Sequence, residues 1–321
     1  MVKVMTMDKK IPIAISACLL GQEVRFDGGH KNDAYINGTL SEYFSFLPLC
    51  PEVGIGLSIP RPPIRLVQHA QGIRLVGVKD PSIDVTEAMQ AYSARVVEEL
   101  TEVRGVILKK GSPSCGMERV KLYAPDGRSI DKTSGLFAAA LRERHPLLPI
   151  EEEGRLGDPG LRENFITRVF VYHAWRELNR QGLSAGRLID FHSDHKYLIM
   201  AHNQAAYRSM GKMLANAGKE DIAALALEYE QALMHALAKP AERQQHVNVL
   251  QHLLGYLRQQ LDSEDKAEML EIIEQYRQGI VPLIVPITLL KHHFRRHPHD
   301  YIDRQVYLSP HPHELMLRNL L

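Results

Sequence analysis

Hydrophobic and polar positions follow a mixed strand and helix pattern in the first 150 residues. Short apolar runs rich in β-branched residues, typical of buried strands, alternate with segments of amphipathic helical spacing. This order predicts an α/β domain that is Rossmann-like, with a mostly parallel sheet and helices on its faces. Strands are expected at 11–20, 73–79 and 104–110, helices at 84–100 and 134–145, and a helix leading into a strand at 40–50.

The second half has a different pattern, because apolar residues recur there at intervals of three and four. Such spacing predicts an all-helical domain. The segment EEEGRLGDPG at 151–160 is acidic and then rich in Gly and Pro, which is typical of a linker. We therefore predict an α/β domain at 1–152 and an all-helical domain at 153–321. Helices are expected at 161–179, 190–217, 223–238, 242–261 and 265–280.

The composition is that of an ordinary globular protein, with 45% hydrophobic and 24% charged residues among 321. The chain has no run of 18 apolar residues, and its start carries only a short apolar stretch after its lysines, so neither a membrane span nor a signal peptide is expected. Three widely spaced cysteines indicate a reduced, cytoplasmic protein. The net charge of +1 excludes a grossly basic RNA-coating protein but allows local basic faces.

The three cysteines occupy similar settings. Cys18, Cys50 and Cys115 each follow an apolar, strand-like run, and none lies in the helical half. Because the carboxyl ends of parallel strands share one edge of a sheet, we expect the three thiolates to meet at one point. The alternative is that each is a small buried hydrophobic residue.

Two kinds of metal centre suit three thiolates. Zinc would need a fourth ligand, for which His30 is the candidate. An iron–sulfur cluster with three cysteines would leave one iron free to hold substrate. The spacing of the cysteines does not distinguish these two possibilities.

Four motifs give the first half a family resemblance. SACLLG, VRFDGGH, CPEVGIGL followed by PRPP, and KKGSPSCG occur in this order, and over about residues 10–150 the chain resembles the thiouracil desulfidase family. The second half, with FHSDHKYLIMAH and YLSPHPHELMLRN, resembles a helical domain often fused behind the first. This two-domain arrangement is similar to that of desulfidases that remove sulfur from 4-thiouridine in transfer RNA.

The resemblance implies a cofactor, a reaction and partners. It implies that Cys18, Cys50 and Cys115 hold a 4Fe-4S cluster whose fourth iron takes the sulfur as hydrosulfide, and that Glu52 and Ser112 take part in catalysis. It also implies a tRNA containing thiolated uridine, or free thiouracil, as the partner. Glu52 would accept a proton from the attacking water and Ser112 would orient that water or the substrate. A surface carboxylate and a turn hydroxyl are the structural alternatives.

Supporting residues are expected around this site. Ser16 could donate a hydrogen bond to a cluster sulfur. Arg61, the arginine within PRPP, could meet a phosphate, with a solvated surface arginine as the alternative. The candidate substrate contacts are Ser16, Arg25, Asp27, Lys109 and Ser114.

The helical half contains 13 of the 16 histidines. They lack the H-E-x-x-H arrangement of zinc proteases, so hydrogen bonding within the protein is favoured over metal binding. The segment KHHFRR at 291–296, with Lys196, Arg304 and nearby tyrosines, could form an RNA-binding stripe. Two other functions remain open: a desulfidase of free thiobases whose helical half mediates oligomerisation, and a non-catalytic zinc or RNA-binding adaptor.

Overall fold

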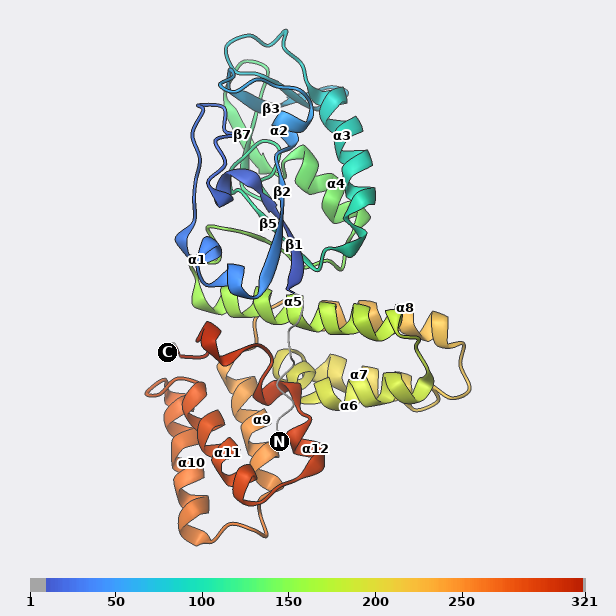
Figure 1. Ribbon diagram of the computed structural model, residues 1–321, viewed down its shortest axis with the longest axis vertical. Helices are drawn as coiled ribbons and strands as arrows, with labels where there is room; N and C mark the ends of the chain where they lie inside the picture. The colour runs from blue at the N-terminus through green and yellow to red at the C-terminus, as the bar shows by residue number, and fades with distance from the viewer. Residues whose placement is uncertain (1–9, 320–321) are drawn as a thin grey trace. The chain divides into compact units, whose positions relative to one another are not determined.

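The computed structural model describes residues 10–319, which fall into two compact units divided between Gly157 and Asp158. The expectation about a signal peptide concerns residues 1–16, of which the first nine lie outside the described part. The first unit is α/β and the second is helical, so the predicted fold class is confirmed (Figure 1).

A four-stranded parallel sheet forms the centre of the α/β unit. Its strands are β1 (Ile11–Ser16), β2 (Phe44–Leu49), β5 (Gly105–Leu108) and β8 (Ile150–Glu152), in the order β2-β1-β5-β8. Strand β5 is entirely buried, which explains its continuous apolar character. All four carboxyl ends lie at one edge of the sheet, because the strands are parallel.

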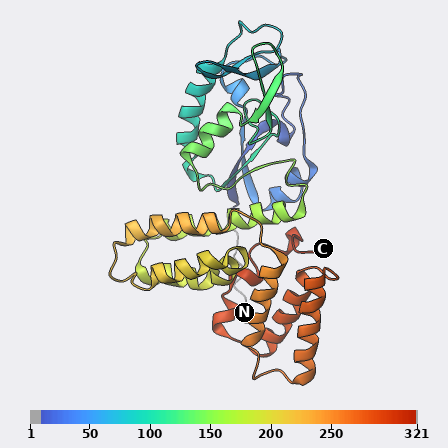
Figure 2. The same ribbon diagram turned by 180° about the vertical axis from the view of Figure 1, so that it is seen from behind.

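Two helices accompany this sheet. The helices α3 (Thr86–Glu99) and α4 (Leu136–Arg144) lie side by side in both views (Figures 1 and 2). They bury their apolar faces through residues such as Met89 and Phe137, each fully buried. Both helices were predicted, because their 3.6-residue periodicity is clear in the sequence.

A second sheet was not predicted from the sequence. It has the order β4-β3-β6-β7 and mixes antiparallel and parallel pairs. Its outer strand β7, SIDKT, is almost wholly exposed and polar, so it carries no hydrophobic alternation. The strands are β3 (Ile64–His69), β4 (Gly72–Gly77), β6 (Val120–Tyr123) and β7 (Ser129–Thr133).

Three expected elements differ in the structure. The stretch 40–50 forms only a 3₁₀ turn, Leu40–Glu42, before β2, so the expected helix is wrong. The strand expected at 11–20 ends at Ser16, where a 3₁₀ turn, Ala17–Leu20, begins. The start of the expected linker belongs to strand β8. In the segments that form β2 and β8, pairing within the sheet outweighs the local preference for helix or loop.

The second unit is helical throughout residues 158–319. The segment 190–217, expected as one helix, is two, because Asn203 is extended and its side chain caps the next helix by accepting from the Ala206 amide. In the described part of the chain, no helix is long and apolar enough to cross a membrane. The helices are α5 (Pro159–Arg180), α6 (Ala185–His202), α7 (Gln204–Leu214), α8 (Ile222–Ala236), α9 (Arg243–Gly255), α10 (Ser263–Gln278), α11 (Ile284–Arg296) and α12 (Asp300–Asp303).

Several histidines of the helical unit are packing residues. His192 and His246 are buried and bond through Nδ1 to the hydroxyls of Tyr229 (3.2 Å) and Tyr307 (3.0 Å). His195 donates from Nδ1 to the Phe191 carbonyl at 2.7 Å and stacks on the Phe191 ring. Burial lowers the pKa of His192 and of His195 to about 4, so both rings are neutral at pH 7. They hold the helices together as hydrogen-bonding residues.

Candidate active site

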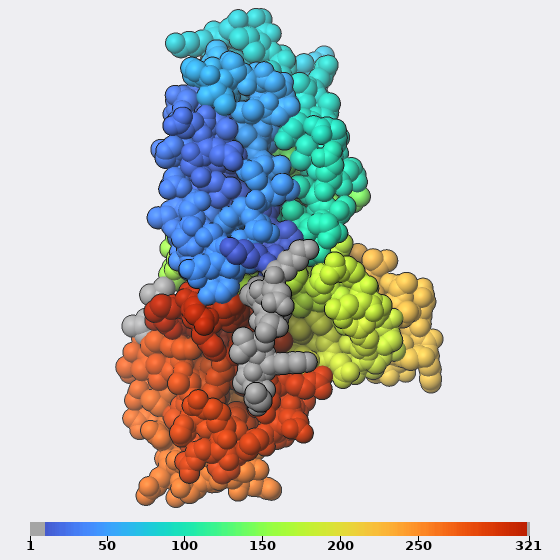
Figure 3. All heavy atoms as spheres, in the orientation of Figure 1, coloured from blue at the N-terminus to red at the C-terminus, as the bar shows by residue number. Residues whose placement is uncertain are grey.

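The three cysteines follow three neighbouring strands of the parallel sheet. Cys18 lies in the 3₁₀ turn after β1, and Cys50 precedes the short helix α2 (Pro51–Gly54) after β2. Cys115 lies in the turn after β5. The chain between β1 and β2 forms much of the blue surface of this unit in Figure 3. The sheet thus brings to one edge three residues that are far apart in the sequence.

All three cysteines line one cavity of about 370 Å³. Glu52 and Ser112 line the same cavity, so the proposed catalytic pair and the three thiols face a common space. Charged groups also border it. The other lining residues used below are Ser16, Val24, Arg25, Lys31, Arg61, Lys109 and Lys110.

In the described part of the chain, the three cysteines share one cavity but do not form a site for a single metal ion. Among residues 10–319, no group of three or more His, Cys, Asp or Glu side chains is arranged to hold one metal ion. His30, the candidate fourth zinc ligand, is exposed, accepts from the Asn32 amide and does not line the cavity. Three soft thiols spread around one cavity fit a cluster, in which each cysteine binds a different iron, better than they fit zinc.

The cavity modifies the acidity of its thiols. Burial raises the pKa of Cys18, Cys50 and Cys115, and neighbouring thiols add to the effect at Cys18 and Cys115. A hydrogen bond with Ser16 opposes the rise in pKa at Cys115, and the charges of Arg25 and Lys109 oppose it at Cys18. The free thiols are therefore protonated at neutral pH, and cofactor binding would release protons.

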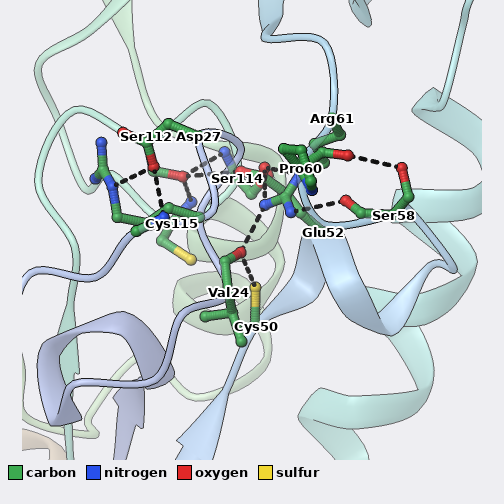
Figure 4. Close-up of polar contacts among 12 residues, drawn as sticks. Val24, Asp27, Cys50, Glu52, Ser58, Pro60, Arg61, Ser112, Ser114 and Cys115 are labelled. Atoms are coloured by element: carbon green, nitrogen blue, oxygen red, sulfur yellow. Dashed lines mark hydrogen bonds and ion pairs between the residues drawn. The ribbon is translucent and has the colours of Figure 1, made fainter.

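Glu52 is held at both of its carboxylate oxygens (Figure 4). Its Oε1 accepts from the Ser114 hydroxyl at 3.1 Å and from the Ser112 hydroxyl at 3.4 Å. Its Oε2 accepts two bonds from the Arg61 guanidinium, at 2.7 and 3.0 Å. A cation and two hydroxyl donors thus fix the position of the carboxylate. Glu52 is only 13% exposed, so it is not the surface carboxylate considered as an alternative.

Arg61 was assigned incorrectly from the sequence. Its side chain is 3% exposed and paired with Glu52, so neither a phosphate contact nor a solvated surface position describes it. The only signal in the sequence was its place within PRPP, which does not reveal a partner nine residues earlier. The Glu52–Arg61 pair is therefore the functional contact that sequence reasoning missed.

The turn that carries Cys115 is fixed by residues at the end of β8 and directly after it. The Glu152 carboxylate accepts from the Met117 amide at 2.7 Å, and Glu153 accepts from the Lys110 amide at 2.7 Å and pairs with the Lys109 ammonium. These glutamates belong to the segment expected to be a linker. Two of its acidic residues anchor the site instead.

A glycine lets the chain pass close behind this turn. A Cβ at Gly135 would lie 2.5 Å from the Ser114 carbonyl and 2.9 Å from the Cys115 amide nitrogen. The Gly135 amide also donates to the Gly116 carbonyl. Only glycine permits this approach, which fixes the turn against the start of α4.

The remaining candidate substrate contacts divide into two groups. Ser16, Arg25 and Lys109 line the cavity. Asp27 does not; it accepts from the Gly29 amide and the Arg25 side chain and braces the RFDGG turn. Ser114 is fully buried behind Glu52 and does not line the cavity. The geometry thus gives Ser114 a contact with Glu52 in place of a contact with substrate.

Two family models match this chain. A model of the 2-thiouracil desulfurase family matches residues 13–153, which include all three cysteines, Glu52 and Ser112. This chain belongs to the thiouracil desulfidase family, fused to a DUF1722 region. That second model, described as a protein of unknown function, matches residues 196–312.

The relatives of this thiouracil desulfidase family member include two curated proteins and one solved structure. The uncharacterized protein YbgA of Escherichia coli (strain K12) is 31% identical over 158 residues, which are 49% of this chain and 94% of YbgA. The uncharacterized protein YbbK of Bacillus subtilis (strain 168) is 32% identical over 137 residues, 41% of this chain and 89% of YbbK. The [4Fe-4S]-dependent thiouracil desulfidase TudS is 34% identical, covers 46% of this chain and 95% of its own, and has a TM-score of 0.37.

Proposed function

We propose that this protein is a 4Fe-4S-dependent desulfidase that replaces the sulfur of a thiolated uracil by oxygen and releases hydrosulfide, with 4-thiouridine in tRNA as its substrate. The observation that carries the proposal is that three strand-end cysteines, Glu52 and Ser112 line one cavity. The match to the 2-thiouracil desulfurase family supports the reaction, and the 34% sequence identity to a [4Fe-4S]-dependent thiouracil desulfidase supports the cofactor.

Cys18, Cys50 and Cys115 would hold the cluster. When bound, it would supply an iron without a cysteine ligand, a soft Lewis acid suited to a departing sulfur. Side chains of the protein orient and deprotonate the attacking water. Ser112 holds its hydroxyl between the Cys115 amide, from which it accepts, and Glu52, to which it donates. It can orient a water or the substrate from this position.

Glu52 acts as the general base. Water adds to the thiocarbonyl carbon, a C–O bond forms, the C–S bond breaks, and Glu52 accepts the proton that the water loses. Sulfur leaves as hydrosulfide, and no electrons are gained or lost. The contacts with Arg61 and Ser112 fix the Glu52 carboxylate beside the cavity, which suits this role.

The charge at the cavity supports an anionic substrate. Arg25, Lys31, Lys109 and Lys110 all border the cavity, and Lys31 and Lys110 are exposed. Cations placed in this way attract the phosphates of a nucleotide or an RNA. A free base would need none of them.

The helical unit is proposed to bind the RNA, because a base must be unstacked before its carbon can reach a buried cavity. Lys196 lies over the rings of Tyr301 (4.6 Å) and Tyr197 (5.1 Å), a combination of charge and aromatic surface that suits nucleic acid. Arg304 forms ion pairs with Asp190 and Asp194, so it does not extend a free basic stripe.

Anaerobic reconstitution followed by metal analysis tests the proposal. We expect about four irons and about four acid-labile sulfides per chain, and release of hydrosulfide from thiolated tRNA. The rate constant kcat/KM for tRNA should fall steeply with salt, whereas that for free 4-thiouracil should not. One zinc without iron, or a fully loaded protein inactive on every thiolated substrate, would contradict the proposal. Activity confined to free 4-thiouracil would support the proposed reaction but contradict tRNA as the substrate.

A further inference from the structure

Arg61 makes more contacts than the salt bridge with Glu52. Its Nε and Nη2 both donate to Glu52 Oε2, Nη2 also donates to the Val24 carbonyl at 3.0 Å, and Nη1 donates to the Ser58 carbonyl at 3.3 Å. Its backbone amide donates to the Phe26 carbonyl at 2.9 Å. One buried guanidinium therefore joins Glu52 to the loop that follows Cys18.

The geometry of these bonds fixes the orientation of the carboxylate. Two donors of one rigid planar group converge on a single oxygen, Oε2, which prevents the carboxylate from exchanging its oxygens by rotation. Oε1 is then left to the hydroxyls of Ser112 and Ser114. A lysine at position 61 would place one ammonium where the guanidinium places three nitrogens, so it could not keep all of these contacts.

The same guanidinium reaches the cysteine side of the cavity. The Val24 carbonyl, which accepts from Arg61, also accepts from the Cys50 thiol at 3.8 Å. Figure 4 shows both contacts at the Val24 carbonyl. Val24 and Arg61 both line the cavity. Arg61 thus determines where Glu52 lies relative to a wall that includes Cys50.

We propose that Arg61 is a positioning residue for Glu52: it holds Oε2 so that Oε1 and the Ser112 hydroxyl face the reacting water together. This inference rests on the desulfidase function proposed above. Arg61 touches neither the water nor the uracil in this scheme and acts entirely through Glu52. This positioning role predicts that the loss of Arg61 slows the chemical step by the same factor for every thiolated substrate.

The test compares Arg61→Lys and Arg61→Gln with the wild-type holoenzyme. We expect both variants to keep iron and sulfide content, to lower kcat by about 100-fold, as a misplaced catalytic group does, and to leave KM nearly unchanged. The decrease should be equal for thiolated tRNA and free 4-thiouracil. Arg65→Lys is the matched control, because Arg65 of β3 lies over the ring of Tyr123 in β6 and does not line the cavity.

A double-mutant cycle gives a measurement that a merely structural role would not change. If Arg61 acts through Glu52, Arg61→Lys should cause little further loss of kcat in the Glu52→Gln background. If the two residues acted independently, the double variant would lower kcat by the product of the two single factors.

Three results would overturn the inference: kcat near the wild-type value in both Arg61 variants, a raised KM for tRNA alone, or loss of iron from both variants. A wild-type holoenzyme that is inactive on every thiolated substrate would instead refute the proposed function itself.

Discussion

The two units both bury polar side chains, but they use them differently. In the α/β unit, Ser16 and Arg61 line a cavity, and Arg61 and the fully buried Ser114 both donate to the carboxylate of Glu52, which faces that cavity. In the helical unit, His192 and His246 bond to tyrosine hydroxyls inside a packed core. Buried polar groups around a space can act on a ligand, whereas those that satisfy one another only fix the fold.

The difference shows that residue chemistry alone does not identify a site. Thirteen histidines would suggest that the helical unit carries the chemistry, yet the arrangement favours three cysteines in the other unit. The predictions below test this contrast, beginning with the largest expected effect.

Removing one cysteine should have the largest effect. In Cys115→Ala we expect loss of bound iron and of all measurable turnover, because two thiolates do not suffice to hold a cluster of this type. The double variant His192→Gln/His195→Gln should keep its full iron content. Iron and sulfide analysis after anaerobic purification measures both. Iron loss in the histidine variant would show that the helical unit also takes part in holding the iron.

Glu52→Gln should have the second largest effect on turnover. It keeps the shape of the side chain but removes the base, so kcat should fall by about 1,000-fold while visible absorption from the cluster persists. Glu151→Gln is the matched control, since Glu151 pairs with Arg155 and does not line the cavity. Unchanged turnover in Glu52→Gln would show that Glu52 is not the general base.

Acid should destabilise the helical unit. The pKa of buried His192 and His195 is lowered from 6.5 to about 4, so between these values the unfolded chain binds protons that the folded unit excludes. The stability that the neutral rings contribute is therefore fully present above about pH 6.5 and is lost as the pH falls toward 4. Within this window, each histidine should lower the free energy of unfolding by up to about 1.4 kcal/mol for every pH unit of acidification.

A single buried fluorophore reports on this acid effect. Trp175 is the one tryptophan of the chain and is fully buried in the helical unit, so denaturant unfolding followed by its fluorescence isolates that unit. The double variant His192→Gln/His195→Gln is the control and should flatten the pH dependence. A free energy of unfolding that rises as the pH is lowered from 6.5 to 4 would contradict the assignment of neutral histidines.

A single methyl group gives the smallest effect. Gly135→Ala would press a Cβ against the Cys115 turn and should cost about 1–3 kcal/mol of stability, together with part of the bound iron. The same substitution at Gly211, within α7 and with open space around it, should stabilise the helical unit by about 1 kcal/mol. Thermal unfolding of both variants measures the difference. Equal effects at both positions would show that Gly135 is not constrained by the turn.

Much of the fold could be predicted because its elements are periodic. The helices α3 and α4 and the strands β1 and β5 follow from apolar spacing, and the place of the cysteines after strands follows from the same pattern. The second sheet could not be predicted, because β7 is polar and exposed and its pairing with β6 leaves no periodic signal.

The site was harder to predict than the fold. Motifs singled out Glu52 and Ser112, which the structure brings within 3.4 Å across 60 residues of sequence. The contacts of Arg61, Glu152 and Glu153 depend on tertiary placement, which neither composition nor spacing encodes. Asp27, expected to contact substrate, instead accepts from the amide of Gly29 two residues later, a local contact that turn-forming residues often make.

The pairing of β1 with β5 sets the order in which this protein can be completed. Ile13 pairs with Gly105, and β5 in turn pairs with β8, so the sheet edge forms only after residues from both ends of the α/β unit have been synthesised. Sheets with such distant partners fold late and slowly. On a growing chain the three thiols therefore stay apart until β8 has been made, and cofactor loading must wait for that last strand of the sheet.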